Sequence, residues 1–354
     1  MTVSVAPDRL KTFCRDVFLR VGTDSHDAEI LADTLIAANL RGVDTHGVMR
    51  LSLYASRIEK KILNTDRRAI TVLSESATTC LMEGAHAPGQ ILGVMAMDRA
   101  IELARSAGIG IVGVRNSNNF GAAAYYAMKA LDHNMIGIVM AETGPILAPY
   151  GSLVATLGNN PLAAAIPAGD FPPVVLDIAM SVAAGGKVRK AAQEGDSIPE
   201  GWVMTGEGYC TTDPHDYLDP DTKSVLLPFA GHKGSGLAII IGLLAGVMTG
   251  PTFGMAVGGA FSMEFPQGAG HLYIALNVEH MCETAEFKGR VDARIRELKT
   301  CPRAPGFDDI LVPGELEHRT QTERLQKGIP IGAALLKEMR ELGTRLGVDF
   351  PATT

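Results

Sequence analysis

Residues 108–114 read GIGIVGV, and their three glycines have the spacing G-x-G-x-x-G. In a Rossmann fold this spacing follows a strand and opens a helix, whose N-terminus then meets a dinucleotide pyrophosphate. Here the apolar pattern puts the glycines behind a helix over residues 90–107 and inside the strand itself. Asp132 lies about 20 residues further on, as the fingerprint requires, but the context contradicts the motif. We therefore reject the stretch as a dinucleotide fingerprint, and a dinucleotide cofactor, if one is present, is bound in some other way.

The first 75 residues are predicted to be helical. Apolar side chains within residues 10–21 recur with i, i+3, i+4 spacing and form one stripe. Asp24 is a good N-cap for a second helix that runs through residues 28–40. The Thr45 hydroxyl is expected to cap a third helix.

From about residue 70 the pattern alternates between strands and helices, which is typical of an α/β domain. The predicted strands cover residues 70–73, 78–82, 108–114, 135–140, 174–178 and 271–277, and the main predicted helices cover residues 90–107, 122–131 and 237–248.

Two further amphipathic helices are predicted near the C-terminus, over residues 288–300 and 331–346. We expect them to pack back on the N-terminal helices, because the ends of a domain often meet. The predicted organisation is a helical domain of residues 1–75 plus 288–354, and an α/β domain of residues 76–287 with a mainly helical insertion at about 180–260.

Composition argues against several classes of protein. The chain has 354 residues, 46% of them hydrophobic, which is enough for a large core and argues against disorder. A net charge of −7 without a long basic run argues against nucleic-acid binding. The longest apolar run, residues 237–250, is shorter than the ~18–20 residues of a membrane span. Five scattered cysteines without a CxxC pair, and no apolar leader, predict a cytoplasmic protein. The nine histidines form no HxxxH or HExxH pattern, so no metal site is expected.

Two short segments carry candidate chemistry. Residues 41–50, RGVDTHGVMR, place His46 four residues before Arg50, and Tyr54 follows four residues later. On a helix these side chains share one face, where an imidazole that exchanges protons lies beside a guanidinium that can hold a carboxylate. The alternative is a solvated helix face. Residues 114–121, VRNSNNFG, lie where a strand ends and a helix begins, a usual place for reacting groups in α/β folds.

The segment 230–236, AGHKGSG, is the best candidate anion site in the sequence. It is a glycine-rich loop directly before a helix pattern, so backbone N–H groups and the helix N-terminus favour negative charge. Lys233 adds a full positive charge. The alternative is a tight turn whose glycines allow close packing, with Lys233 directed to water.

Eight ordered segments resemble those of one family, the type-2 malate/L-lactate dehydrogenases. This group also includes ureidoglycolate, sulfolactate, diketogulonate and cyclic-imine reductases. RGVDTHGVMR is similar to the family's R-G-x-D-S-H-G-x-x-R, and VRNSNNFG to its N-S-N-H-F/Y-G loop. LGNNPLAAAIP resembles G-T-N-P-x-A-x-x-P, and LDIAMSVAAGGKV resembles D-M-A-T-S-x-x-A-x-G-K. The segments IPEGW, TTDP, GHKGSGLA and PGE follow in the family's order.

The resemblance implies a non-Rossmann fold that binds NADH or NADPH, and a homodimer with the site near the subunit interface. It implies a small carboxylate substrate, a 2-oxo acid or its 2-hydroxy or imine relative. By position, Arg50 would clamp the substrate carboxylate, while Thr45, His46 and Tyr54 would line the substrate pocket. The implied cofactor contacts are Thr143, Asp177, Ile178, Ala179, His232, Lys233, Gly234, Pro313, Gly314 and Glu315.

Two positions depart from the family pattern. Thr45 stands where the family has serine, which keeps the hydroxyl. Asn119 stands where the family has the histidine that is its proposed proton donor and acceptor. An asparagine amide binds a carbonyl oxygen but does not titrate near neutral pH. Three explanations remain, in order of preference. His46, or a water held by Asn119, transfers the proton; the substrate is an imine, protonated before it binds; or the protein binds the dinucleotide without catalysis.

Overall fold

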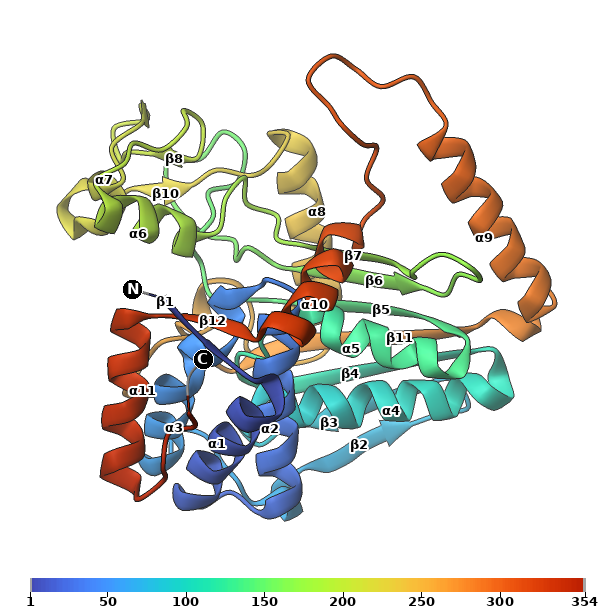
Figure 1. Cartoon of the computed structure of the whole chain (residues 1–354), viewed down its shortest axis with the longest axis horizontal. Helices are drawn as coiled ribbons and strands as arrows, with labels where there is room; N and C mark the ends of the chain where they lie inside the picture. Colours follow the sequence, from blue (N-terminus) through green and yellow to red (C-terminus); the bar gives the residue numbers. More distant parts are fainter. Residues whose placement is uncertain (1, 353–354) are drawn as a thin grey trace.

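The computed structural model describes residues 2–352, and a seven-stranded mixed sheet forms its centre (Figure 1). The strand order is β2-β3-β4-β11-β5-β6-β7, and only the β3–β4 pair is parallel. A Rossmann domain needs a mostly parallel sheet, so its predicted absence is confirmed. The strands are β2 (Thr71–Glu75), β3 (Thr79–Glu83), β4 (Ile109–Ser117), β5 (Met135–Ala141), β6 (Leu162–Ile166), β7 (Val174–Ile178) and β11 (Ala269–Asn277).

The glycines of GIGIVGV serve the packing of a helix on this sheet. Gly108 ends α4 (Gly89–Ala107) with φ +82°, a conformation that glycine adopts without strain. Gly110 lies inside β4, and a Cβ there would come within 2.0 Å of the Ala100 carbonyl oxygen of α4. Glycine therefore lets α4 approach the sheet closely, and α5 (Ala123–Lys129) packs beside α4 on the same layer.

The N-terminal helices agree with their apolar pattern. The buried residues of α1 (Pro7–Arg20) belong to the predicted stripe, and α2 (Ser25–Leu40) begins at Asp24, whose carboxylate accepts two backbone N–H bonds. The third helix differs from the prediction. Residues Asp44–His46 and Val48–Arg50 form two short 3₁₀ turns separated by Gly47, and α3 (Leu51–Glu59) starts only afterwards.

The C-terminal elements pack on the N-terminal layer from residue 315 onward. β12 (Ile329–Gly332) pairs with β1 (Thr2–Val5), while α10 (Glu315–Lys327) contacts α2 and α11 (Ala333–Leu346) contacts α1 and α3. The prediction that the helix over residues 288–300 also packs on the N-terminal helices is wrong.

That helix, α9 (Thr284–Lys299), instead stands at the far end of β6 and β7 (Figure 1). It is attached through Asp292, whose carboxylate accepts the backbone N–H groups of Gly169 and Asp170 at 3.0 and 2.7 Å. These bonds fix the helix far from α1, although its amphipathic pattern resembles that of a packed helix.

The expected mainly helical insertion has mixed structure. It contains α6 (Gly185–Glu194), α7 (His215–Leu218) and α8 (His232–Gly242), and also a small sheet of β8 (Val203–Met204), β9 (Cys210–Thr211) and β10 (Val225–Leu226). Strands of two residues are too short to show an alternating pattern, so periodicity could not predict them. The central sheet also begins at β2, before the predicted boundary at residue 76.

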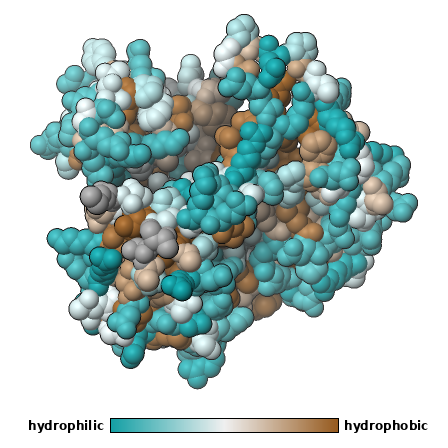
Figure 2. Space-filling model, viewed as in Figure 1, coloured by the Kyte–Doolittle hydropathy of each residue, from teal (hydrophilic) through white to brown (hydrophobic). Residues whose placement is uncertain are grey.

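Hydrophilic residues cover most of the protruding helices and loops on the face drawn in Figure 2, and hydrophobic residues are seen mainly in the recesses between them. Within residues 2–352, no helix has the length and apolar character that crossing a membrane requires.

Candidate active site

A cavity of about 700 Å³ lies where the sheet meets the loop between β4 and α5. The ends of β5, β7 and β11 contribute to it, together with residues from the first 3₁₀ turn. This size is typical of a site for a small molecule or cofactor. The sequence-predicted residues that line it are Thr45, His46, Asn119, Thr143, Asp177, Ile178 and Ala179.

His46 is a neutral imidazole in this cavity. Its Nδ1 lies 3.0 Å from the Thr45 hydroxyl, which therefore does not cap a helix. Burial and the positive charge of Arg50 lower the pKa of His46 to about 4. At neutral pH this side chain can act as a base, but it lacks the second ring proton that an imidazolium would give as an acid.

Arg50 is a cation without a counter-ion beside the cavity. Its Nε donates to the Thr45 carbonyl oxygen at 2.7 Å, and its guanidinium lies 4.5 Å over the Phe261 ring. Burial and the charge of Arg189 lower the pKa of Arg50. No carboxylate within residues 2–352 forms an ion pair with it, so its terminal nitrogens suit an anionic ligand. Arg50 does not itself line the cavity but stands behind Thr45.

Tyr54 positions Asn119 and lies outside the cavity lining, which differs from the expectation that it lines the substrate pocket. It is 2% exposed, and its hydroxyl donates to Asn119 Oδ1 at 2.6 Å. The Gly121 N–H donates to the same oxygen at 3.2 Å. Because both donors occupy Oδ1, the amide NH₂ of Asn119 is the group left for a ligand.

Asp177 joins the end of β7 to the start of α5. Its Oδ2 accepts the Ala124 N–H at 2.8 Å, at the helix N-terminus where a carboxylate is favoured. Burial raises the pKa of Asp177 to about 6, although this bond and the charge of Arg41 oppose the shift. Nearby, the Thr143 hydroxyl donates to Asn159 Oδ1 at 2.8 Å and is thereby held at the cavity wall.

Two groups of expected cofactor contacts are absent from the cavity lining. His232, Lys233 and Gly234 form the first turn of α8, as the loop-to-helix pattern predicted, and Lys233 is exposed.

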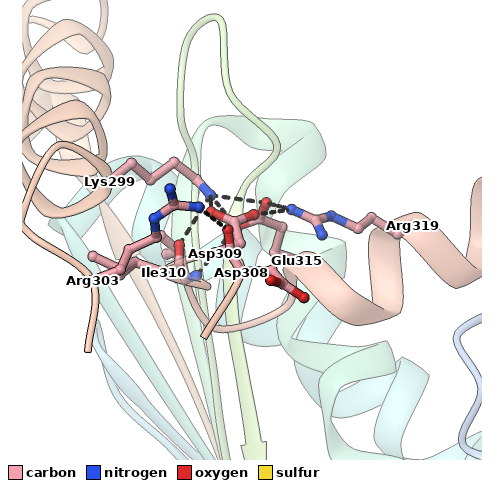
Figure 3. A network of polar contacts seen from close by, with 8 residues as sticks. Lys299, Arg303, Asp308, Asp309, Ile310, Glu315 and Arg319 are labelled. Carbon is pink, nitrogen blue, oxygen red and sulfur yellow. Dashed lines mark hydrogen bonds and ion pairs between the residues drawn. The ribbon is translucent and has the colours of Figure 1, made fainter. Parts of the chain in front are cut away.

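The segment Pro313–Glu315 lies beside β7, where the Val175 N–H donates to the Pro313 carbonyl at 2.9 Å. Glu315 belongs to a network with Lys299, at 2.8 Å, and Arg319 (Figure 3). Glu317, two residues after Glu315 on α10, lines the cavity in place of Glu315.

The cavity also contains polar residues that the sequence reasoning missed: Arg41, Glu142, Asn159, Ser181, Lys187, Gln267, His271 and Glu317. Lys187 matches the lysine of the family pattern in the segment LDIAMSVAAGGKV, so the sequence contained a signal that could have identified it as a site residue. Gln267 and His271 had none, because one precedes and the other lies within an apolar strand.

Three buried atoms of this set have no hydrogen-bond partner within residues 2–352: Glu142 Oε2, Ser181 Oγ and Gln267 Oε1. An unsatisfied buried polar group costs about 1–3 kcal/mol. A polar ligand in the cavity could satisfy such atoms, so the lining fits a nicotinamide dinucleotide by its size and by its unpaired polar groups.

Comparison with known proteins agrees with this geometry. The family model for malate/L-lactate dehydrogenase matches residues 5–340. The chain is 38% identical to a malate dehydrogenase of Pyrococcus abyssi, over 98% of this chain and 96% of that protein. The malate dehydrogenase structure from Entamoeba histolytica superposes with a TM-score of 0.95 at 32% identity, covering 99% and 100% of the two chains. The structure of delta1-piperideine-2-carboxylate reductase from Pseudomonas syringae superposes with a TM-score of 0.82 at 27% sequence identity. The match covers 96% of this chain and 99% of that chain. The chain therefore belongs to the malate/L-lactate dehydrogenase family.

Proposed function

We propose that this protein is an NAD(P)-dependent oxidoreductase that moves hydride between the nicotinamide and C2 of a small 2-oxo or 2-hydroxy acid. The observation that carries the proposal is a cavity lined by the neutral imidazole of His46, the free amide of Asn119 and four of the expected cofactor contacts, Thr143, Asp177, Ile178 and Ala179. The unpaired guanidinium of Arg50 stands beside it.

Thr143, Asp177, Ile178 and Ala179 would hold the cofactor, with Lys187 near its phosphates. The 232–234 turn and the 313–315 segment remain proposed contacts for the parts of the cofactor that extend beyond the cavity. When bound, the nicotinamide supplies or accepts the hydride. NADH and NADPH are both candidates.

The chain's own groups then have separate tasks. Arg50 binds the substrate carboxylate through two parallel hydrogen bonds. The Asn119 NH₂ donates to the oxygen on C2 and polarises it. His46 takes the hydroxyl proton during oxidation, directly or through a water. The bound carboxylate offsets the charge of Arg50, so it raises the pKa of His46 and lets the imidazole return that proton during reduction.

The test is nicotinamide absorbance with both cofactors against a panel of 2-oxo acids, their 2-hydroxy partners and cyclic imino acids. Turnover on an oxo acid, lost in His46→Gln, is the expected result. Cofactor binding without any turnover would instead support a non-catalytic dinucleotide-binding protein. If the protein neither binds a cofactor nor turns over a substrate, both the oxidoreductase and the non-catalytic dinucleotide-binding protein are contradicted.

The second candidate is a cyclic-imine reductase. It is favoured by Asn119, since an imine that is already protonated accepts hydride without an acid from the protein. The likeness to the piperideine-carboxylate reductase structure supports it as well. Turnover on imino acids alone would select this candidate, and Asn119→His would then bring no gain on oxo acids.

A homodimer is the proposed assembly, with the site near the subunit interface. α8 and the π-helical turn that follows it (Leu243–Val247) expose an apolar stripe to solvent. The stripe has helical spacing and consists of Leu237, Ile240, Leu243, Val247 and Met248. Light scattering should give twice the mass of the chain, and Ile240→Glu, at a residue 53% exposed, should shift it toward the monomer. A monomeric wild type would contradict this assignment.

A further inference from the structure

The floor of the cavity contains a histidine that the proposed mechanism does not use. Gln267, Ala269 and His271 all line the cavity at the start of β11, where every second side chain faces the same side. His271 is 1% exposed and lies between Val114 of β4 and Ala141 of β5. Burial lowers the pKa of His271 to about 3, so the imidazole is neutral.

The hydrogen bond to Tyr273 determines which ring nitrogen of His271 carries the proton. The Tyr273 hydroxyl lies 3.2 Å from His271 Nδ1, and no other group within residues 2–352 hydrogen-bonds it. Tyr273 is fully buried, and burial raises its pKa, so the hydroxyl keeps its hydrogen. A buried O–H with one available acceptor donates to it. With Nδ1 as the acceptor, the neutral ring has its hydrogen on Nε2. This is the arrangement in which both donors can be satisfied, because His271 lines the cavity, where a ligand can accept from Nε2–H, whereas Tyr273 does not line it.

The Nε2–H group has no partner within the described chain, although the ring is almost completely enclosed. Phe120, the neighbour of Asn119, stacks on the imidazole with the centroids 4.5 Å apart and the planes at 28°. The stacking and the Tyr273 bond together hold the ring in one orientation. A fixed, neutral donor is therefore available at the wall of the cavity.

We propose that His271 is a ligand-binding residue of this site, whose Nε2–H donates to a carbonyl-type oxygen of the bound ligand. Such an oxygen occurs on the nicotinamide carboxamide and on C2 of the substrate. The inference rests on the proposed function for the ligand. It gives His271 a role distinct from that of His46, because a donor locked in one neutral tautomer polarises an oxygen without exchanging its proton.

The tautomer can be measured without any ligand. In ¹⁵N-labelled protein at neutral pH, long-range proton–nitrogen correlation should show the His271 ring with Nε2 protonated and Nδ1 bare; His271→Gln identifies the signal by its loss. Tyr273→Phe removes the one hydroxyl that the described residues place at Nδ1 and should populate the other tautomer. A wild-type ring protonated on Nδ1, or charged at neutral pH, overturns the inference.

Two substitutions test the donor itself. The side-chain amide of His271→Gln can place an N–H near the position of Nε2, whereas His271→Phe keeps a flat ring and removes the donor. Thermal unfolding and circular dichroism establish that both variants fold. We expect His271→Phe to lose about tenfold in one ligand constant and His271→Gln to stay within a few-fold of wild type.

The two arms of this experiment distinguish the source of the oxygen. A loss in cofactor affinity, measured by quenching of protein fluorescence, assigns the carboxamide; a loss in kcat with unchanged cofactor affinity assigns the substrate. If His271→Phe and His271→Gln both fold and show the same cofactor affinity and the same kcat, the inference is refuted. A wild type that neither binds cofactor nor turns over substrate would refute the proposed function instead, and the tautomer measurement would still stand.

Discussion

Removal of the Tyr54 hydroxyl should reduce activity through Asn119, although Tyr54 does not line the cavity. In Tyr54→Phe the ring still fills its buried position, so packing is preserved. What is lost is the 2.6 Å bond to Asn119 Oδ1, while the weaker 3.2 Å bond from Gly121 remains. The amide can then rotate, and its NH₂ faces the ligand for a smaller part of the time.

The magnitude follows from that one bond. A buried neutral hydrogen bond contributes about 0.5–1.5 kcal/mol, and about 1.4 kcal/mol corresponds to a factor of ten in rate. We therefore expect kcat/KM to fall between about twofold and tenfold, and the free energy of unfolding by about 1 kcal/mol.

The assay is a double-mutant cycle of Tyr54→Phe and Asn119→Ala, read as kcat/KM for the best substrate of the panel. If Tyr54 acts by positioning Asn119, its substitution changes nothing once Asn119 is alanine. Equal losses in both backgrounds, or unchanged kinetics in the single variant, would refute the positioning role.

Further outcomes are expected from the same geometry. Arg50→Lys should raise KM strongly with a smaller effect on kcat, because an ammonium group cannot form two parallel bonds to a carboxylate; unchanged kinetics would remove Arg50 from the site. With His46 as the base, kcat/KM for oxidation should stay level as the pH falls toward about 5 and drop through about 4, and Arg50→Gln should move this limb to higher pH. Asn119→His should raise activity on 2-oxo acids if a missing acid limits the rate, and a slower variant on all substrates would contradict this. The pKa of Asp177 is raised, so the native state binds the extra proton and its stability falls as the pH rises through about 6. Asp177→Asn should therefore raise Tm at neutral pH and leave it unchanged below about pH 4, whereas a uniform shift would point to another cause.

Much of the fold was predictable because the relevant signals are local. The stripe of α1, the Asp24 cap of α2 and the glycine that ends α4 each depend on residues within a few positions of one another. The rejection of the dinucleotide fingerprint followed from the same kind of information, namely that the glycines come after a helix.

The candidate site was predictable only in part. Residues within matched segments, such as His46, Asn119 and Asp177, do meet in one cavity. The shared helix face of His46 and Tyr54 was wrong, because Gly47 interrupts the helix and sends Tyr54 to a buried position behind Asn119.

By itself, then, the sequence determined most of the helices, most strands of the central sheet, and which family the segments resemble. Only the tertiary structure decided that β11 enters the sheet between β4 and β5, and this insertion brings His271 to the cavity floor. It also decided that Glu315 pairs with Lys299 while Glu317 reaches the cavity. Propensity and capping act over a few residues, whereas these contacts join segments more than a hundred residues apart or depend on which side of a helix meets its neighbour.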